Sequence, residues 1–308
     1  MLNDFVDVIN WPREELIDEV LRSQEYIACN LPRTENYPKM HGIDYFIFVE
    51  PLKACTGGDF AAVVNFKQYN LQKKIEKAEK EGRFEYAKRL AKNIDKMGIL
   101  IADAPGHKVS AGIPITMLYG AFMMAMVNAL DYVGEFTPDA IEKMNAIFYN
   151  WIKSTFVQDK PYTTMAYYEI DNDGAIRFAL LGHPGPMVYL YEFERFMELD
   201  GKHKRSSTPL GIIPRNYRAD IDHYETGSDD HPVNEIRLEG QGDIMILPSD
   251  GLTDHRIGEE YFTKTRLESI LKEAKNEKAE NIYKAIMEGM RSYSKIEDDV
   301  TIAVIKKR

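Results

Sequence analysis

The sequence predicts a mixed α and β fold that is built mainly on antiparallel strands. Apolar runs of strand length recur along the chain, and many are joined by short connections, which favour antiparallel pairing over a parallel sheet. Segments whose apolar residues follow helical spacing lie between and after these runs. No glycine-rich phosphate loop follows any of the runs, so the sequence does not support a nucleotide-binding α/β fold.

The predicted strands are short apolar runs, bounded by turn residues. They cover 44–50, 61–66, 98–103, 163–170, 175–182, 187–191, 243–248 and 301–305. The turn-rich tetrapeptide DNDG joins 163–170 to 175–182, so we expect these two strands to form a hairpin.

The predicted helices lie mainly at the two ends of the chain and in its middle. They cover about 13–30, a segment that begins at Thr137, and segments near 259–273 and 277–292. Thr137 is followed by Pro138 and Asp139, a combination typical of a helix start. The polar segment 200–235 predicts a surface loop.

Residues 111–130 carry no charge, and this length matches a membrane-spanning helix. Pro114, Gly120 and Asn128 interrupt the apolar run, and no basic cluster flanks it closely. We therefore expect a helix that is buried in a large core, and no membrane partner. A membrane-attached regulator is the alternative.

Residues 67–96 are locally basic, with ten Lys or Arg and five acidic residues. They predict two helical stretches that are broken near Gly82. The simpler interpretation is a solvated helical hairpin with an apolar stripe of Leu90, Ala91 and Ile94. The alternative is an element for docking or dimerisation.

The composition argues against several classes of protein function. The 308 residues carry a net charge of −10, so nucleic acid gains no general electrostatic attraction and is not an expected partner. Cys29 and Cys55 are too few for a disulfide framework, and the N-terminus does not read as a signal peptide. These features predict a cytoplasmic protein.

Four acidic segments lie far apart in the chain, and each places an Asp at or beside the end of a strand-like run. They are TGGDF at 56–60, IADAPGHK at 101–108, LPSDGLTD at 247–254 and EDDVT at 297–301. A fold that gathers these carboxylates would offer oxygen ligands suited to Mg²⁺ or Mn²⁺. The seven histidines form no H-E-x-x-H pattern, so a zinc site is not expected.

The order of the motifs resembles the SpoIIE/RsbU-type branch of the metal-dependent protein phosphatases, the PPM superfamily. The matching segments are RSQEYIACNLP (22–32), GGDF (57–60), DAPGHK (103–108), GHPGP (182–186), PLGIIP (209–214), SDGLTD (249–254) and DDVT (298–301). The resemblance covers about 20–308. Any one motif is weak, but the whole series in order is specific.

This resemblance implies an α+β fold: a four-layer sandwich of two antiparallel sheets that are flanked by helices. Residues 36–308 would form the phosphatase domain, with 67–96 as a helical insertion. Residues 1–35 would form an N-terminal helical linker. Such a linker can pair between subunits in relatives, which would give a homodimer.

The resemblance also implies ligands for two Mn²⁺ or Mg²⁺ ions: Asp59, Asp103, the backbone carbonyl of Ala104, Asp250 and Asp298. Asp103 would bridge the ions, Asp250 and Asp298 would bind the second ion, and Asp59 would bind the first, directly or through water. Asp59, Asp103, Asp250 and Asp298 are thus the expected catalytic residues.

Several positions near these ligands depart from the family pattern or lie beside it. Ala62 stands where relatives commonly carry an acidic residue, and Lys108 stands where glycine is usual. Lys108 would either crowd the site or contact substrate phosphate, and we expect His107 to act in the outer shell of the metal site. Asp299, next to Asp298, is an alternative outer-shell or substrate contact.

The function implied by the resemblance is hydrolysis of phosphoserine or phosphothreonine by a metal-activated water. The partner would be a phosphorylated regulatory protein, often an anti-sigma-factor antagonist in bacterial partner-switching signalling. A degenerate phosphatase domain that binds without turnover is the alternative. A diguanylate cyclase is not supported, because Phe60 and Ala61 follow Asp59 where that motif needs an acidic residue.

Overall fold

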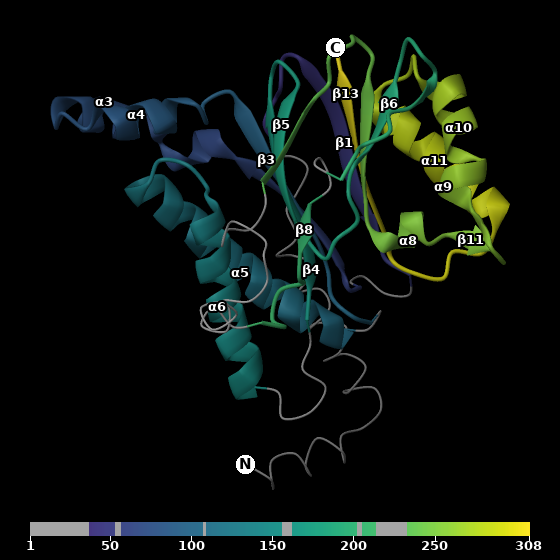
Figure 1. Ribbon diagram of the computed structural model, residues 1–308, viewed down its shortest axis with the longest axis horizontal. Coiled ribbons are helices and arrows are strands. Elements are labelled where there is room, and N and C mark those ends of the chain that lie inside the picture. The colour runs from purple at the N-terminus through teal and green to yellow at the C-terminus, as the bar shows by residue number, and fades with distance from the viewer. Residues whose placement is uncertain (1–36, 53–56, 107–108, 156–161, 202–204, 214–232) are drawn as a thin grey trace, which may run out of the picture.

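The computed structural model describes residues 37–52, 57–106, 109–155, 162–201, 205–213 and 233–308. In it, two sheets lie face to face and helices cover both outer faces, which confirms the expected four-layer α+β sandwich (Figure 1). The predicted linker at 1–35 lies outside the described residues.

The five-stranded sheet has the order β1-β13-β10-β6-β7, and all its neighbouring strands are antiparallel. Its strands are β1 (Ile43–Glu50), β13 (Val300–Lys307), β10 (Ile244–Pro248), β6 (Met187–Leu190) and β7 (Arg195–Phe196). The C-terminal strand β13 therefore lies at the side of β1, although almost the whole chain separates them.

The six-stranded sheet has the order β2-β3-β4-β5-β8, and β9 also pairs with β5. Its strands are β2 (Asp59–Asn65), β3 (Lys96–Asp103), β4 (Thr164–Asp171), β5 (Ala175–Leu181), β8 (Ser206–Ser207) and β9 (Val233–Arg237). β4 and β5 form the predicted hairpin. The short pair β5–β8 is parallel, whereas the other pairs of this sheet are antiparallel.

Strand β3 shows why the apolar runs are continuous rather than alternating. Its odd positions, including Ile99 and Ile101, pack in the core between the two sheets. Its even positions Leu100 and Ala102 pack under the helices of the outer layer. Both faces of a central strand are buried in this architecture, so both sets of side chains are apolar.

The helices form the two outer layers. α5 (Val109–Tyr132) and α6 (Pro138–Thr155) cover the six-stranded sheet. α9 (Phe262–Thr265), α10 (Leu267–Ala274) and α11 (Ala279–Tyr293) cover the five-stranded sheet. The helix predicted near 259–273 begins later than expected, because β11 (Arg256–Ile257) and β12 (Glu260–Tyr261) first form a small hairpin.

Helix α5 contains the uncharged run at 111–130. Among the described residues it is the one helix that is long and apolar enough to cross a membrane, with a mean hydropathy of 1.6 over an 18-residue window within 111–132. Half of that window is buried inside the fold. Leu118, Phe122 and Met126 pack against the six-stranded sheet and α6, whereas Ile113 and Met124 are exposed, so the helix belongs to the core on one side and is not buried on all sides as expected.

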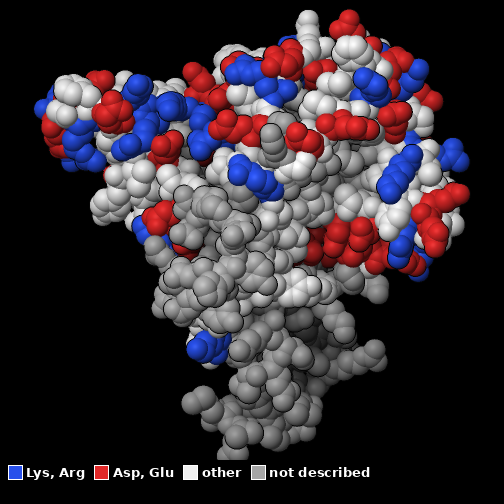
Figure 2. All heavy atoms as spheres, in the orientation of Figure 1, with Lys and Arg blue, Asp and Glu red and all other residues white. Residues whose placement is uncertain are grey.

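The segment 67–96 forms the predicted hairpin, with a short 3-10 helix η2 (Phe66–Tyr69) followed by α3 (Leu71–Lys80) and α4 (Phe84–Ala91). It extends from the sandwich at the ends of β2 and β3 that lie away from Asp59 and Asp103 (Figure 1). Lysines and arginines gather on its surface (Figure 2).

One side of this hairpin belongs to the core, so it is not only a solvated appendage. Leu71, Ile75 and Leu90 are buried, whereas Ala91 is exposed and does not continue the expected stripe. The hydroxyl of Tyr86 donates to the carbonyl oxygens of Leu130 and Asp131 at the end of α5. The hairpin thus satisfies carbonyls that a helix end leaves without partners.

Candidate metal centre

Asp59 and Asp103 lie directly opposite each other across two neighbouring strands. Asp59 is the first residue of β2, Asp103 is the last residue of β3, and the register pairs them. Two like charges at such a position destabilise a sheet. A pair of this kind is therefore expected where a cation offsets the repulsion.

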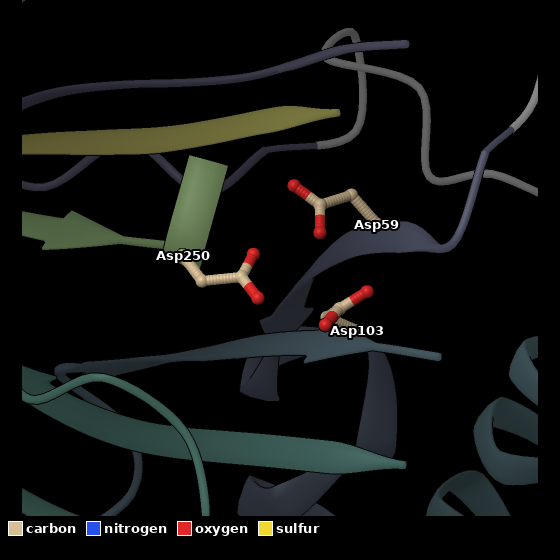
Figure 3. A group of neighbouring side chains, drawn as sticks. All are labelled: Asp59, Asp103 and Asp250. Atoms are coloured by element: carbon tan, nitrogen blue, oxygen red, sulfur yellow. The ribbon is translucent and has the colours of Figure 1, made fainter. Parts of the chain in front are cut away.

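Asp250 approaches this pair from the other sheet. It begins α8 (Asp250–Thr253), the single helical turn that follows β10. One carboxylate oxygen from each of Asp59, Asp103 and Asp250 lies within 4.8 Å of the other two. Figure 3 shows the three carboxylates converging from separate elements.

Asp59 is held by two hydroxyl groups. The Oγ of Ser249 donates to Asp59 Oδ2 at 2.6 Å, and the Oγ1 of Thr301 donates to the same oxygen at 2.7 Å. Ser249 Oγ in turn accepts from the backbone N–H of Thr301 at 2.9 Å. With Oδ2 fixed from the opposite sheet, Oδ1 of Asp59 is left as the oxygen for a ligand.

Asp59 and Asp250 occupy an environment that opposes their ionisation. Burial raises the pKa of Asp59 well above its usual value, and the charge of Asp103 adds to the rise. Burial also raises the pKa of Asp250, with the charge of Asp298 as the next cause. Buried carboxylates that are crowded in this way are typical of metal sites, because a cation reverses both effects.

Gly58 leaves room beside two of the expected ligand atoms. A Cβ at this position would lie 2.1 Å from the carbonyl oxygen of Ala104 and 3.1 Å from Oδ1 of Asp103. The backbone N–H of Ala104 donates to the carbonyl oxygen of Gly58 at 3.0 Å, which fixes the two loops together. The glycine of the GGDF segment therefore keeps both oxygens uncovered.

The two aspartates of DDVT occupy different environments. Asp298 lies close enough to Asp250 to raise its pKa, but its carboxylate is outside the group of three described above. Asp299 is 2% exposed, and its two oxygens accept from the backbone N–H groups of Leu52 at 2.6 Å and Gly58 at 2.8 Å. Asp299 thus ties both ends of the loop before β2 to the start of β13.

Three other residues near the expected ligands in sequence are His107, Lys108 and Ala62. His107 and Lys108 lie outside the described residues. Ala62 is buried under the helical layer with Phe60, whereas Ala61 faces the core between the sheets. Since side chains alternate along a strand, Ala62 lies on the face of β2 opposite to Asp59.

Sequence reasoning missed the supporting residues Ser249 and Thr301. Both lie within acidic motifs, directly before Asp250 and at the end of DDVT. Their short hydroxyl side chains beside expected ligands were the available signal. Ser249 is not a nucleophile candidate in this structure, because it is fully buried and its hydroxyl is used by Asp59.

Comparisons with known proteins agree with the fold described above. The family model described as stage II sporulation protein E (SpoIIE) matches residues 93–308. A search of curated protein sequences found no match.

Solved structures share the fold. The SiaA-PP2C domain of Pseudomonas aeruginosa is 16% identical with a TM-score of 0.64, and the match covers 96% of this chain and 98% of that domain. The RsbU and RsbW domains of Rv1364c from Mycobacterium tuberculosis are 18% identical with a TM-score of 0.57, covering 88% of this chain and 63% of theirs. The PP2C phosphatase domain of SpoIIE from Bacillus subtilis was solved with a fragment of its regulatory domain. It is 18% identical with a TM-score of 0.57, and the match covers 87% of this chain and 64% of that one.

Proposed function

Because the chain belongs to the SpoIIE family of PPM-type serine/threonine phosphatases, we propose that it hydrolyses phosphoserine or phosphothreonine on a regulatory protein in a metal-dependent reaction. The observation that carries this proposal is the convergence of Asp59, Asp103 and Asp250 from two sheets to within 4.8 Å. Three acidic side chains this close, one of them buried and two half-buried, are favoured in their ionised form by a bound cation.

The donor set favours hard divalent cations. Asp59, Asp103, Asp250 and the carbonyl of Ala104 offer oxygen only, which suits Mg²⁺ or Mn²⁺. RsbX, which shares the fold at 12% identity and a TM-score of 0.51, was solved in complex with magnesium. Asp298, beside Asp250, would complete the second of two ion sites.

The residues of this chain would prepare the site for the reaction. A pair of bound cations supplies an activated water and neutralises phosphate charge during in-line attack. Asp59, Asp103 and Asp250 would hold the cations, with Asp103 as the expected shared ligand, since Asp103 pairs with Asp59 across neighbouring strands and Asp250 comes from the other sheet. Ser249 and Thr301 hold Asp59 in one orientation, so little rearrangement is needed when an ion binds.

The proposed partner is a phosphorylated regulatory protein, such as an anti-sigma-factor antagonist domain, in the cytoplasm. The family assignment supports this choice, as does the shared fold with a solved protein that contains RsbU and RsbW domains. Hydrolysis of a phosphoserine there would switch the partner's interactions, since the phosphate contributes nearly two negative charges.

A metal-dependence assay tests the proposal. Purified chain is assayed on p-nitrophenyl phosphate and a phosphoserine peptide with Mn²⁺, Mg²⁺ or EDTA. We expect activity with Mn²⁺ or Mg²⁺, none in EDTA, and loss of activity in Asp103→Asn and Asp250→Asn. Asp95→Asn, an exposed aspartate in the turn before β3, is the matched control and should retain activity.

The outcome also separates the alternative of a degenerate domain. Phosphate release that does not depend on metal, or that survives both aspartate substitutions, contradicts the proposed mechanism. Binding of a phosphoprotein without turnover in every metal would instead support a non-catalytic binding module.

A further inference from the structure

The carboxylates of the candidate site come from two sheets, and among the described residues no backbone–backbone hydrogen bond joins the sheets at this point. Asp59 and Asp103 belong to the six-stranded sheet, and Asp250 follows β10 of the five-stranded sheet. Their mutual distances therefore depend on how far apart the sheets are held at this end. A side chain that links the sheets here would control the geometry of the cluster.

His183 makes such a link. Its ring Nδ1 lies 2.8 Å from the hydroxyl of Thr164, and its Nε2 lies 3.1 Å from the carbonyl oxygen of Pro248. Thr164 is the register partner of Asp103 on β4. Pro248 ends β10, two residues before Asp250. The imidazole thus spans from the strand beside one aspartate to the strand that leads into another.

The partners of the ring define its hydrogen-bonding state. The carbonyl of Pro248 can only accept, so Nε2 must carry a proton and donate to it. A neutral ring then leaves Nδ1 as the acceptor for the Thr164 hydroxyl. Both ring nitrogens are satisfied, and the side chain is only 4% exposed.

The turn that carries His183 is itself fixed. Gly182 has φ of 67°, in the left-handed region, and its N–H donates to the carbonyl oxygen of Ser207 at 2.8 Å. A Cβ on Gly182 would lie 2.3 Å from Cγ of Pro209. The GHPGP segment and the start of the PLGIIP segment therefore pack against each other and fix the position of the imidazole. This packing gives both motifs a structural role.

We propose that His183 is a positioning residue that sets the separation between Asp103 and Asp250 by joining Thr164 to Pro248. This inference rests on the proposed metal site, but not on catalytic turnover. Loss of the two hydrogen bonds of the imidazole should reduce the free energy of metal binding more than it reduces the free energy of unfolding of the metal-free protein.

A graded series of variants tests the link in the full chain. His183→Asn can retain the bond to Thr164, His183→Gln can retain the bond to Pro248, and His183→Ala retains neither. Thr164→Val removes the hydroxyl with little change of shape, whereas Thr164→Ser keeps it. The control is Asn234→Ala, because Asn234 is 1% exposed and hydrogen-bonds only within the edge of the six-stranded sheet.

The readouts are Mn²⁺ affinity by titration calorimetry, thermal unfolding in EDTA, and the Mn²⁺ dependence of hydrolysis. We expect His183→Ala to weaken Mn²⁺ binding about tenfold or more, the effect typical of lost outer-shell support. The Asn and Gln variants should fall between it and the wild type. Thr164→Ser should bind like the wild type, and Thr164→Val should resemble His183→Gln, because both keep only the bond to Pro248.

Each result decides the proposal. If His183→Ala binds Mn²⁺ within about twofold of a control variant of equal melting temperature, His183 only stabilises the fold and the proposal is wrong. If the wild type binds Mn²⁺, loses affinity in His183→Ala and hydrolyses no phosphoester, the positioning role stands while the proposed phosphatase function fails.

Discussion

The hydroxyl of Ser249 donates to Oδ2 of Asp59 at 2.6 Å, across 190 positions of sequence and between the two sheets. Thr301 donates to the same oxygen from the neighbouring strand. The expected metal ligand Asp59 is thus oriented by residues of two other acidic motifs. The motifs are linked by direct contacts between their residues as well as by a shared expected ion site.

Removal of one hydroxyl should loosen Asp59 without removing a ligand. We expect Ser249→Ala to weaken Mn²⁺ binding by about tenfold. It should also destabilise the metal-free fold by about 1–3 kcal/mol, because the N–H of Thr301 loses its buried acceptor. Titration calorimetry and thermal unfolding check the two effects. Unchanged Mn²⁺ affinity would show that Asp59 needs no support from Ser249.

The adjacent aspartates of DDVT should separate into two phenotypes. Asp299→Asn replaces an oxygen acceptor with an amide donor facing a backbone N–H, either of Leu52 or of Gly58, so stability should fall by about 1–3 kcal/mol. Asp298→Asn should cost less stability and more metal affinity, as expected for a ligand of the second ion. The reverse pattern in unfolding and Mn²⁺ titrations would exchange the assigned roles.

Without bound metal, the buried carboxylate of Asp59 should destabilise the folded protein, and this destabilisation should depend on pH. Since the native pKa of Asp59 is raised, its proton stabilises the fold at low pH, and this stabilisation is lost as pH rises through the raised value. Asp59→Asn should therefore raise the melting temperature in EDTA at pH 8 more than at pH 5, while it weakens Mn²⁺ binding.

The check is a set of melting curves in EDTA across this range, with Asp95→Asn as the exposed control. A loss of stability in Asp59→Asn that is equal at both pH values would contradict the assigned environment of this carboxylate.

The space beside Gly58 gives a direct steric test. Gly58→Ala would place a Cβ 2.1 Å from the Ala104 carbonyl oxygen, so that oxygen must move and metal affinity should fall by about tenfold or more. Gly120→Ala is the control, because nothing lies within 4 Å of its Cβ on helix α5. That change should stabilise the fold by about 0.5–1 kcal/mol. Equal Mn²⁺ affinities for both variants would argue against Ala104 as a ligand.

The elements with two apolar faces or strong helical spacing were predictable from sequence. The eight predicted strands correspond to β1, β2, β3, β4, β5, β6, β10 and β13. β9 was missed because VNEIR has only two apolar residues, Val233 and Ile236, which do not alternate with polar ones, and because it lies in a segment whose composition is typical of a loop. The two-residue strands β7 and β8 depend on tertiary pairing and carry no local signal.

The aspartates of the candidate site were predictable from the sequence, but the residues that hold them in position were not. The acidic motifs and their order indicated which aspartates belong together. The hydroxyl of Ser249 and the ring of His183 act across the space between the sheets, and no local pattern encodes such a contact. The different surroundings of Asp298 and Asp299 likewise depend on which carboxylate faces the backbone of Gly58, which only the fold decides.

A crystal of the full chain grown with Mn²⁺, measured at a wavelength where manganese scatters anomalously, tests the metal centre most directly. We expect two anomalous peaks about 3.5–4 Å apart among Asp59, Asp103, Asp250 and Asp298, with the Asp103 carboxylate touching both. Manganese bound elsewhere, or no peak between these carboxylates at saturating Mn²⁺, would contradict this expectation.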